Sequence, residues 1–258
     1  MAQQRKLFRY EGTPKGGGFI DSVSLELPAD DSLLEDYPFT IPAIRALRRL
    51  QLHPCVTFLT GENGSGKSTL LEAIAVKLDF SAEGGTRNMQ YATRDTHSPL
   101  HEYLRISRLV PREKWGWFLR AESFYTMANA AESLHALGSF GWKSPHMQSH
   151  GEAFLSLLTE LDAAGLYLFD EPEAALSTQR QMSALVQMHR LCQAGSQFIV
   201  ATHSPILLAY PYATILLCDD AGLHPVKYEE TDAYRLTLQF LKNHPRMLEM
   251  LLEDEKED

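Results

Sequence analysis

The sequence contains little cysteine, and this scarcity limits the kinds of protein that it can encode. Only Cys55, Cys192 and Cys218 occur among 258 residues, and their spacing is not that of a zinc site. Few, widely separated cysteines are typical of buried thiols in a reducing compartment and not of a disulfide framework. We therefore expect a cytoplasmic protein.

Long apolar runs are also absent. The most apolar stretch, residues 198–218, is interrupted by His203, Pro205 and Pro211, whereas a membrane span needs about 20 mostly apolar residues. Residues 1–10 include basic side chains but no apolar run follows them, so they do not form a secretory signal. The sequence therefore predicts no membrane-spanning segment.

An excess of basic charge is absent too. The chain has 24 basic and 33 acidic residues, a net charge of -9, and we expect residues 253–258 to form a solvated acidic tail. A mildly acidic chain does not coat nucleic acid through bulk charge, although it leaves room for a local basic patch. At 44% hydrophobic and 22% charged residues, the composition is that of a globular domain.

Compact apolar runs that follow helical patterns predict buried parallel strands, at residues 55–60, 117–120, 166–169, 198–201 and 214–218. Near the N-terminus, Val23, Leu25 and Leu27 alternate with polar residues, which predicts a half-buried strand that is either an edge strand or antiparallel to its neighbours. Strands that alternate with helices indicate an α/β fold with a mostly parallel central sheet flanked by helices. We expect one domain over residues 1–252, with an N-terminal antiparallel β element.

Helices are predicted between these strands. The helix after Ser177 has an N-cap, a C-terminal Gly195, and an apolar face that we assign to Met182, Leu185, Val186 and Cys192. Residues 219–222 predict a hairpin turn into a strand at 226–228, and residues 126–155 predict a small helical lid inserted into the core. Further helices are expected at residues 42–50, 68–78 and 231–252.

A phosphate-binding loop stands between a predicted strand and a predicted helix. The pattern G-x-x-x-x-G-K-S/T needs glycines so that backbone N–H groups can point at phosphate, and a helix N-terminus adds partial positive charge. Lys67 should reach the β- and γ-phosphates, and Ser68 should bind Mg²⁺. Thr69, the next residue in the chain, is also expected at the nucleotide. The nucleotide-binding residues of this P-loop NTPase motif are Gly61, Glu62, Asn63, Gly64, Ser65, Gly66, Lys67, Ser68 and Thr69.

Two carboxylates end the apolar run at residues 166–169. Asp170 then lies at the carboxyl end of a buried strand, where open α/β sheets bind ligands, and we expect it to hold Mg²⁺ from a second side. Glu171 is placed to accept a hydrogen bond from the water that attacks the γ-phosphate. Asp170 and Glu171 thus complete a predicted site for ATP hydrolysis.

The residues that follow carry a family resemblance. Glu171 is followed by the run Pro-Glu-Ala-Ala-Leu-Ser, and the next strand ends in Ala-Thr-His-Ser-Pro with His203 at its centre. The chain resembles the ATP-binding-cassette (ABC) class of P-loop ATPases, in which Walker B is followed by a D-loop, here residues 175–177, and by a switch histidine, here His203. The resemblance implies ATP and Mg²⁺ as cofactors, with Lys67, Glu171 and His203 as catalytic residues.

The same resemblance implies further site residues. Ser149, Gly151 and Glu152 stand where the class has its signature sequence, which binds the γ-phosphate of ATP held by a second subunit. Glu122 stands where the class has a metal-coupled Q-loop glutamine, and Gln90 is a weaker candidate. Tyr37 and Phe39 precede the phosphate loop as adenine-stacking residues would, although packing is the favoured interpretation.

Three functions fit this pattern. The first is an ATPase of the soluble branch, which includes chromosome-maintenance, recombination and OLD-type ATPases; it dimerises head to tail on ATP and drives an unidentified partner protein. The second is the nucleotide-binding subunit of a membrane transporter. The third is the ATPase module of a DNA-repair or defence system that gates a separate nuclease or toxin, with a possible basic patch of Arg105, Arg108, Arg112, Lys114 and Arg120.

Overall fold

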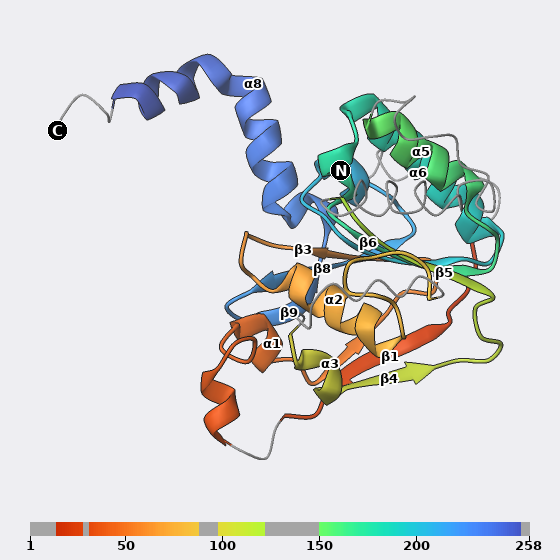
Figure 1. Cartoon of the computed structure of the whole chain (residues 1–258). Coiled ribbons are helices and arrows are strands. Elements are labelled where there is room, and N and C mark those ends of the chain that lie inside the picture. Colours follow the sequence, from red (N-terminus) through yellow and green to blue (C-terminus); the bar gives the residue numbers. More distant parts are fainter. Residues whose placement is uncertain (1–13, 28–30, 88–97, 122–149, 254–258) are drawn as a thin grey trace.

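Two β-sheets enclose the helix that follows the glycine-rich loop (Figure 1). The computed structural model describes residues 14–27, 31–87, 98–121 and 150–253. The larger sheet has six strands in the order β5-β6-β7-β3-β8-β9, and the smaller has three in the order β2-β1-β4. The enclosed helix is α2 (Lys67–Lys77).

The larger sheet is the predicted parallel sheet. Its strands are β5 (Trp115–Arg120), β6 (Gly165–Asp170), β7 (Gln197–Ala201), β3 (Val56–Thr60), β8 (Ala213–Asp219) and β9 (Gly222–Val226). Neighbours are parallel except β9, which is antiparallel to β8. Every residue of β3, β6 and β7 is buried, as expected for strands covered on both faces. The predicted α/β fold is therefore confirmed.

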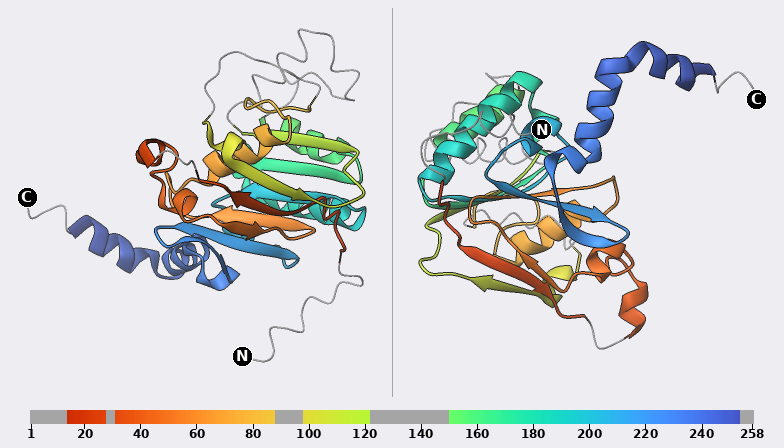
Figure 2. Two further views of the ribbon diagram at one scale, coloured as in Figure 1. Left: turned by 90° about the horizontal axis from the view of Figure 1, so that it is seen from below. Right: turned by 180° about the vertical axis from the view of Figure 1, so that it is seen from behind.

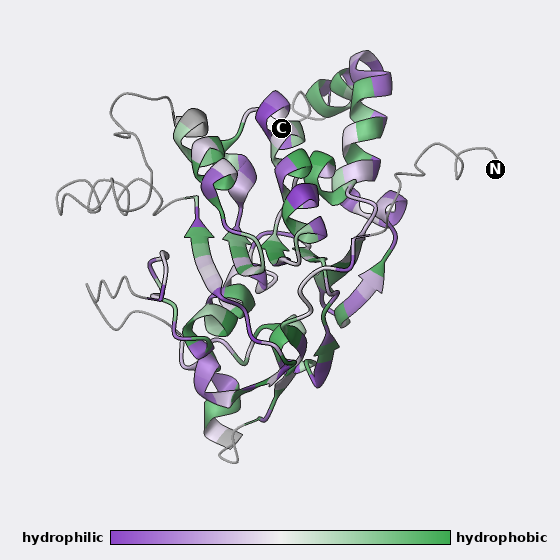
Figure 3. Ribbon diagram, turned by 90° about the vertical axis from the view of Figure 1, so that its right-hand side faces the viewer, coloured by the Kyte–Doolittle hydropathy of each residue, from purple (hydrophilic) through white to green (hydrophobic). Residues whose placement is uncertain are grey.

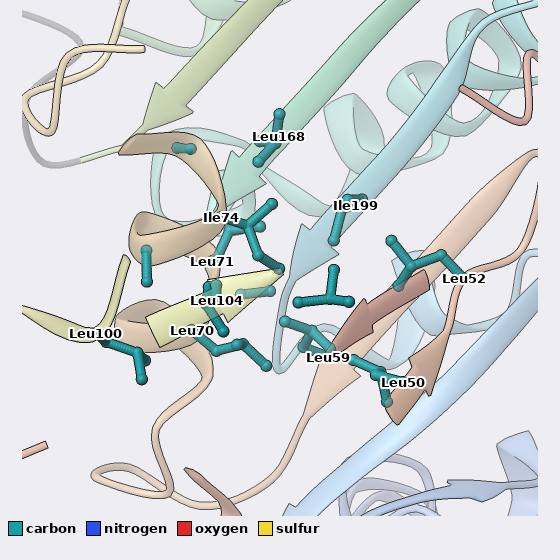
Figure 4. Packing of buried hydrophobic residues seen from close by; sticks show 14 of the residues in the cluster. Leu50, Leu52, Leu59, Leu70, Leu71, Ile74, Leu100, Leu104, Leu168 and Ile199 are labelled. Carbon is teal, nitrogen blue, oxygen red and sulfur yellow. The ribbon is translucent and has the colours of Figure 1, made fainter. Parts of the chain in front are cut away.

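Side chains that alternate along these strands build two hydrophobic clusters. Leu59 and Ile199 point toward α2 and join the cluster drawn in Figure 4. Phe58 and Phe198 join the opposite cluster, which contains residues of α5 (His150–Glu160), α6 (Thr178–Gln193) and α7 (Pro205–Leu208). In Figure 3 the central strands are largely green and the helices mix green with purple, as amphipathic cover requires.

The smaller sheet is the predicted antiparallel element near the N-terminus. Its strands β1 (Ile20–Leu25), β2 (Arg49–Gln51) and β4 (Leu104–Arg108) pair in antiparallel register. The buried amide of Gln197, at the start of β7, ties it to the larger sheet. That amide accepts a hydrogen bond from the Ile20 N–H at 2.9 Å and donates to the carbonyls of Ile20 at 2.9 Å and His53 at 3.1 Å.

One predicted helix is shorter than expected. The prediction at residues 42–50 is right only for α1 (Pro42–Arg45), because residues 49–51 form β2. There Leu50 is buried while Arg49 and Gln51 bond to Asp21, so side chains alternate with the period of a strand. Pairing with β1 determines the conformation of this segment.

Helix α6 has the predicted ends but not the predicted face. The Ser177 hydroxyl accepts from the Arg180 N–H at 3.4 Å, and Gly195 follows the helix at φ +84°. Met182 and Val186 are exposed, however, and the buried face comprises Ala184, Met188, Leu191 and Cys192. Cys192 is the one predicted core position of the helix that is fully buried.

The last helix, α8 (Asp232–Glu253), leaves the body of the molecule (Figures 1 and 2). It confirms the predicted C-terminal helix and has a kink at Asn243, where φ is −132°, two residues before Pro245. The hairpin before it is confirmed with β9 at earlier residues than predicted. Short helices complete the described chain: η2 (Asp31–Glu35), α3 (Leu100–Tyr103), η5 (Pro172–Ala175) and η6 (Tyr228–Glu230).

Two predicted segments lie partly or wholly outside the described residues. Of the lid at 126–155, only the N-terminal part of α5 is described, and the acidic tail is described only at Glu253. Within the described ranges, no helix combines the length and the apolar character that a bilayer crossing requires.

Candidate functional site

The glycine-rich loop has a backbone conformation that favours glycine. Residues 61–68 connect β3 to α2, and Gly61, Gly64 and Gly66 have φ values of +143°, +81° and +97°. A Cβ atom on Gly61 would lie 2.2 Å from the Cys218 carbonyl oxygen. The loop can therefore wrap tightly before α2, whose N-terminal N–H groups face any bound anion.

Lys67 lies buried within this loop. Its Nζ donates to the Gly61 carbonyl at 2.9 Å and to the Glu62 carbonyl at 2.7 Å. Burial lowers the pKa of the Lys67 ammonium, and the nearby carboxylates of Glu171 and Asp170 oppose that shift only in part. The arrangement holds a poorly hydrated cation beside the phosphate-binding N–H groups.

The two predicted magnesium ligands contact each other. The Ser68 hydroxyl, in the first turn of α2, donates to Asp170 Oδ1 at the end of β6 at 2.8 Å. Among the described residues, no group of three or more histidine, cysteine or carboxylate side chains could hold a metal. One hydroxyl and one carboxylate nevertheless fit Mg²⁺, which binds through one or two protein oxygens and takes its other ligands from water and phosphate.

An arginine that sequence reasoning had placed in a basic patch belongs to this site. Arg120, the last residue of β5, donates to Glu72 Oε2 at 2.5 Å and has its Nε 3.6 Å from Asp170 Oδ2. Glu72 lies on α2, one turn after Ser68. Arg120 thus links the phosphate-loop helix to the Asp170 carboxylate, a contact that no sequence motif indicated.

Glu171 and His203 come together at the neighbouring strand ends. His203 Nε2 lies 3.6 Å from Glu171 Oε1, and Glu171 has a positive φ of +49°. Such a backbone is uncommon for a residue other than glycine and occurs often at functional sites. Both side chains are partly exposed, although His203 Nε2 itself is buried and has no hydrogen-bond partner among the described residues.

Side chains around His203 fix the turn that carries it. Glu173 Oε1 accepts from the His203 N–H at 2.6 Å, and the Ser204 hydroxyl donates to Gln181 Oε1 at 2.6 Å while capping α7. The sequence motif after Glu171 includes Glu173 but does not indicate its role, and no local pattern indicated Gln181. The D-loop candidate Ser177 caps α6 in this structure.

A cavity of about 690 Å³ opens beside the loop. Loop residues, the end of β8 and the first turns of α8 line it, including Gly64, Ser65, His203, Asp232 and Leu236. Cys218 also lines it, and burial raises the pKa of that thiol to about 12, so the thiol is neutral. The volume is within the range of small-molecule sites.

The two adenine candidates differ in their surroundings. Phe39 is buried and packs edge-on against Tyr103 with ring centroids 5.2 Å apart, so it is a core residue. Tyr37 is exposed, and its hydroxyl lies 2.9 Å from the Thr69 hydroxyl, immediately after the phosphate loop. Of the two, only Tyr37 is exposed, and its hydroxyl contacts Thr69.

Several predicted residues cannot be placed. Ser149, Glu122 and Gln90 lie outside the described residues. Gly151 and Glu152 are in the first turn of the described part of α5. The signature and Q-loop assignments therefore stay predictions.

The proposed basic patch is largely occupied by ion pairs. Arg105 pairs with Glu26, Arg108 with Glu113, and Arg120 with Glu72. Arg112 and Lys114 are exposed. Three of the five predicted patch residues are therefore paired with carboxylates in this structure.

Known proteins match this chain over the residues that build the site. One family model, described as "AAA domain, putative AbiEii toxin, Type IV TA system", matches residues 152–209, and a second, "AAA domain", matches residues 41–103. The second range contains the glycine-rich loop, and the first contains Asp170, Glu171 and His203.

Curated relatives match over longer stretches. The cytochrome c biogenesis ATP-binding export protein CcmA of Rhodospirillum rubrum is 32% identical over 179 residues, covering 65% of this chain and 75% of that protein. ABC transporter I family member 1 of Arabidopsis thaliana is 29% identical over 164 residues, covering 57% and 69%. The SMC head domain from Thermotoga maritima aligns with a TM-score of 0.45 at 15% identity, covering 81% and 99%.

Proposed function

Because the chain belongs to the ATP-binding-cassette class of P-loop ATPases and is an ATPase, we propose that it dimerises head to tail on two Mg²⁺-ATP molecules and couples their hydrolysis to a partner protein. One observation carries the proposal. The Ser68 hydroxyl and the Asp170 carboxylate meet at 2.8 Å, and Glu171 and His203 stand at the adjoining strand ends. These contacts support a single site in which the loop binds phosphate, Ser68 and Asp170 bind the metal, and Glu171 acts as the base.

Lys67 and the loop backbone bind the phosphates. The Nζ group exchanges its two carbonyl acceptors for β- and γ-phosphate oxygens, which satisfy the buried cation better than neutral carbonyls do. Ser68 and Asp170 hold Mg²⁺, which neutralises phosphate charge when it is bound. Glu122 is proposed as a further residue of the metal site, from the resemblance.

Glu171 is the proposed base for hydrolysis. A water oxygen forms a bond to the γ-phosphorus while the bond from that phosphorus to the β–γ bridging oxygen breaks. The water proton passes to Glu171, and ADP leaves with the bridging electron pair. His203, at 3.6 Å from Glu171, orients the carboxylate and contacts the γ-phosphate.

The second subunit supplies what one copy lacks. Glu171 and His203 are 42% and 36% exposed, so the catalytic side of the site is open in a single chain. By resemblance, Ser149 and the amides near Gly151 and Glu152 of another copy cover it. Closure excludes water other than the attacking molecule, which strengthens every charge interaction in the site.

Two other roles for the same ATPase remain as candidates. The relatives named above include an export protein's ATP-binding chain and an ABC transporter member, which favours a nucleotide-binding subunit that docks on a separate permease. The first family model carries the description of a toxin system, which favours a defence module. Co-purification with an integral membrane protein would support the transporter role. Co-purification with a nuclease or toxin would support the defence role.

The proposal is tested by the solution mass of Glu171→Gln, measured by light scattering with and without Mg²⁺-ATP. This change keeps binding and blocks hydrolysis, so a shift from monomer to dimer only with ATP is expected. Glu171→Gln combined with Lys67→Ala is the control and should stay monomeric. If Glu171→Gln binds ATP and remains a monomer, this result contradicts the shared site.

A further inference from the structure

Helix α8 exposes a long apolar surface that nothing in the described chain covers. None of its residues is buried, although the helix is 22 residues long. Its exposed large apolar side chains are between 39% and 68% accessible: Leu236, Phe240, Leu241, Leu248, Met250, Leu251 and Leu252. Proteins rarely leave so many large apolar side chains of one helix in solvent without a binding partner.

The charges of α8 exclude a membrane surface as the favoured partner. Helices that lie on anionic lipid carry an excess of lysine and arginine on their polar face. Within α8, the three basic residues Arg235, Lys242 and Arg246 are balanced by three acidic ones, Asp232, Glu249 and Glu253. A helix without net charge fits a protein surface of mixed polarity better than a lipid headgroup layer.

The position of α8 indicates which protein covers it. Its first two turns, through Asp232, Ala233, Leu236 and Thr237, line the same cavity as the phosphate loop. From there the helix projects beyond the body of the molecule (Figures 1 and 2). A molecule that closes over the phosphate loop therefore comes close to α8, and the proposed function makes that molecule a second copy.

We propose that the apolar surface of α8 packs against the second copy of this chain when two copies close on ATP. This inference rests on the proposed function. The 22 residues have an axial length of about 33 Å, divided by the kink at Asn243, and the helix diameter is about 10 Å, so α8 covers at most roughly 330 Å² of a partner. A stable dimer buries about 800 Å² per partner. Helix α8 alone is therefore too small to hold a dimer, and it adds to an interface that ATP completes.

The experiment measures dimer affinity in the Glu171→Gln background by analytical ultracentrifugation with Mg²⁺-ATP. Leu241→Glu with Leu248→Glu places two charges on the apolar surface. Lys242→Glu is the matched control, because it changes the net charge by the same amount on the polar side. We expect the leucine pair to weaken dimerisation at least about tenfold and the control less than about threefold.

Two readouts separate interface loss from misfolding. Affinity for a fluorescent ATP analogue, measured at protein concentrations too low for dimerisation, should be unchanged in all three proteins, because these residues lie outside the loop. In the Glu171→Gln protein that carries no change in α8, hydrogen exchange should show that ATP protects the backbone amides of α8.

Each contrary outcome has its own meaning. A dimer whose affinity is unaffected by the leucine changes, with α8 amides unprotected, overturns the role of α8 and leaves the shared ATP site standing. A parent that stays monomeric at saturating ATP overturns both proposals. Cosedimentation with phosphatidylglycerol vesicles that depends on Leu241 and Leu248 would assign α8 to a membrane instead.

Discussion

One added methyl group should have different consequences at Gly64 and Gly66 of the phosphate loop. Both residues have positive φ, +81° and +97°, so alanine at either costs about 1–2 kcal/mol of backbone strain. Their surroundings differ. A Cβ on Gly66 would lie 2.9 Å from Ile41 Cγ2 and 3.3 Å from Ile44 Cγ1, whereas a Cβ on Gly64 has no atom within 4 Å.

The magnitudes follow from these contacts. Ile44 is fully buried, so it cannot move away cheaply, and overpacking of a core costs about 1–3 kcal/mol. Gly66→Ala should therefore lower the free energy of unfolding by about 2–5 kcal/mol in total, and Gly64→Ala by only about 1–2 kcal/mol. The comparison cancels the backbone strain that the two variants share.

Nucleotide affinity should separate the variants in a second way. Gly64 lines the cavity beside the loop, so its methyl group would occupy space that phosphate needs. Gly64→Ala should lose affinity for ATP by about tenfold or more while staying folded. Urea unfolding followed by tryptophan fluorescence gives the stabilities, and a fluorescent ATP analogue gives the affinities. Equal destabilisation by both changes, or unimpaired binding by Gly64→Ala, would refute this reasoning.

Two further changes test the structure outside the loop. Glu113→Gln should lower the free energy of unfolding at pH 7 by about 2 kcal/mol, because the fully buried Glu113 side chain pairs with Arg87 and Arg108. Burial opposes ionisation of Glu113, yet hydrogen bonds from Arg108 and Arg87 hold its pKa below the usual value for glutamate. The ionised pair therefore stabilises the fold fully at any pH above the pKa of an unfolded glutamate. This stabilisation is lost as the pH falls through the lower pKa of the folded protein. The gap to wild type should therefore close in acid unfolding curves. Gln197→Leu should cost about 3 kcal/mol in urea unfolding, because it leaves the buried Ile20 N–H and C=O without partners, and an unchanged midpoint would contradict that role.

Local signals predicted the parts of the fold that depend on neighbouring residues. The loop around Lys67 follows a strand and opens a helix because its glycines and the helix start are adjacent in the chain. The ends of α6 were correct for the same reason, since Ser177 and Gly195 act on their own turns. The buried face of α6 was wrong because two apolar faces have similar spacing, and packing against α5, α7 and β7 selects the one with Ala184 and Met188.

Contacts between distant residues lay beyond sequence reasoning. Arg120 reaches Glu72 across 48 positions, and Gln197 reaches Ile20 across 177. Such partners depend on how the strands are ordered in the two sheets, and a single sequence carries no local pattern for them. Arg120 was accordingly assigned to a surface patch, although its charge is directed at Asp170.

Mixing two inactive variants tests whether a second copy completes each ATP site. Lys67→Ala removes the phosphate-binding cation, and Ser149→Arg disrupts the proposed signature. Each should release almost no phosphate alone, but a mixed dimer contains one site with both elements intact. With random pairing, an equimolar mixture should recover about a quarter of the wild-type rate of phosphate release. A mixture as inactive as its components, although the variants form mixed dimers, would contradict the shared site.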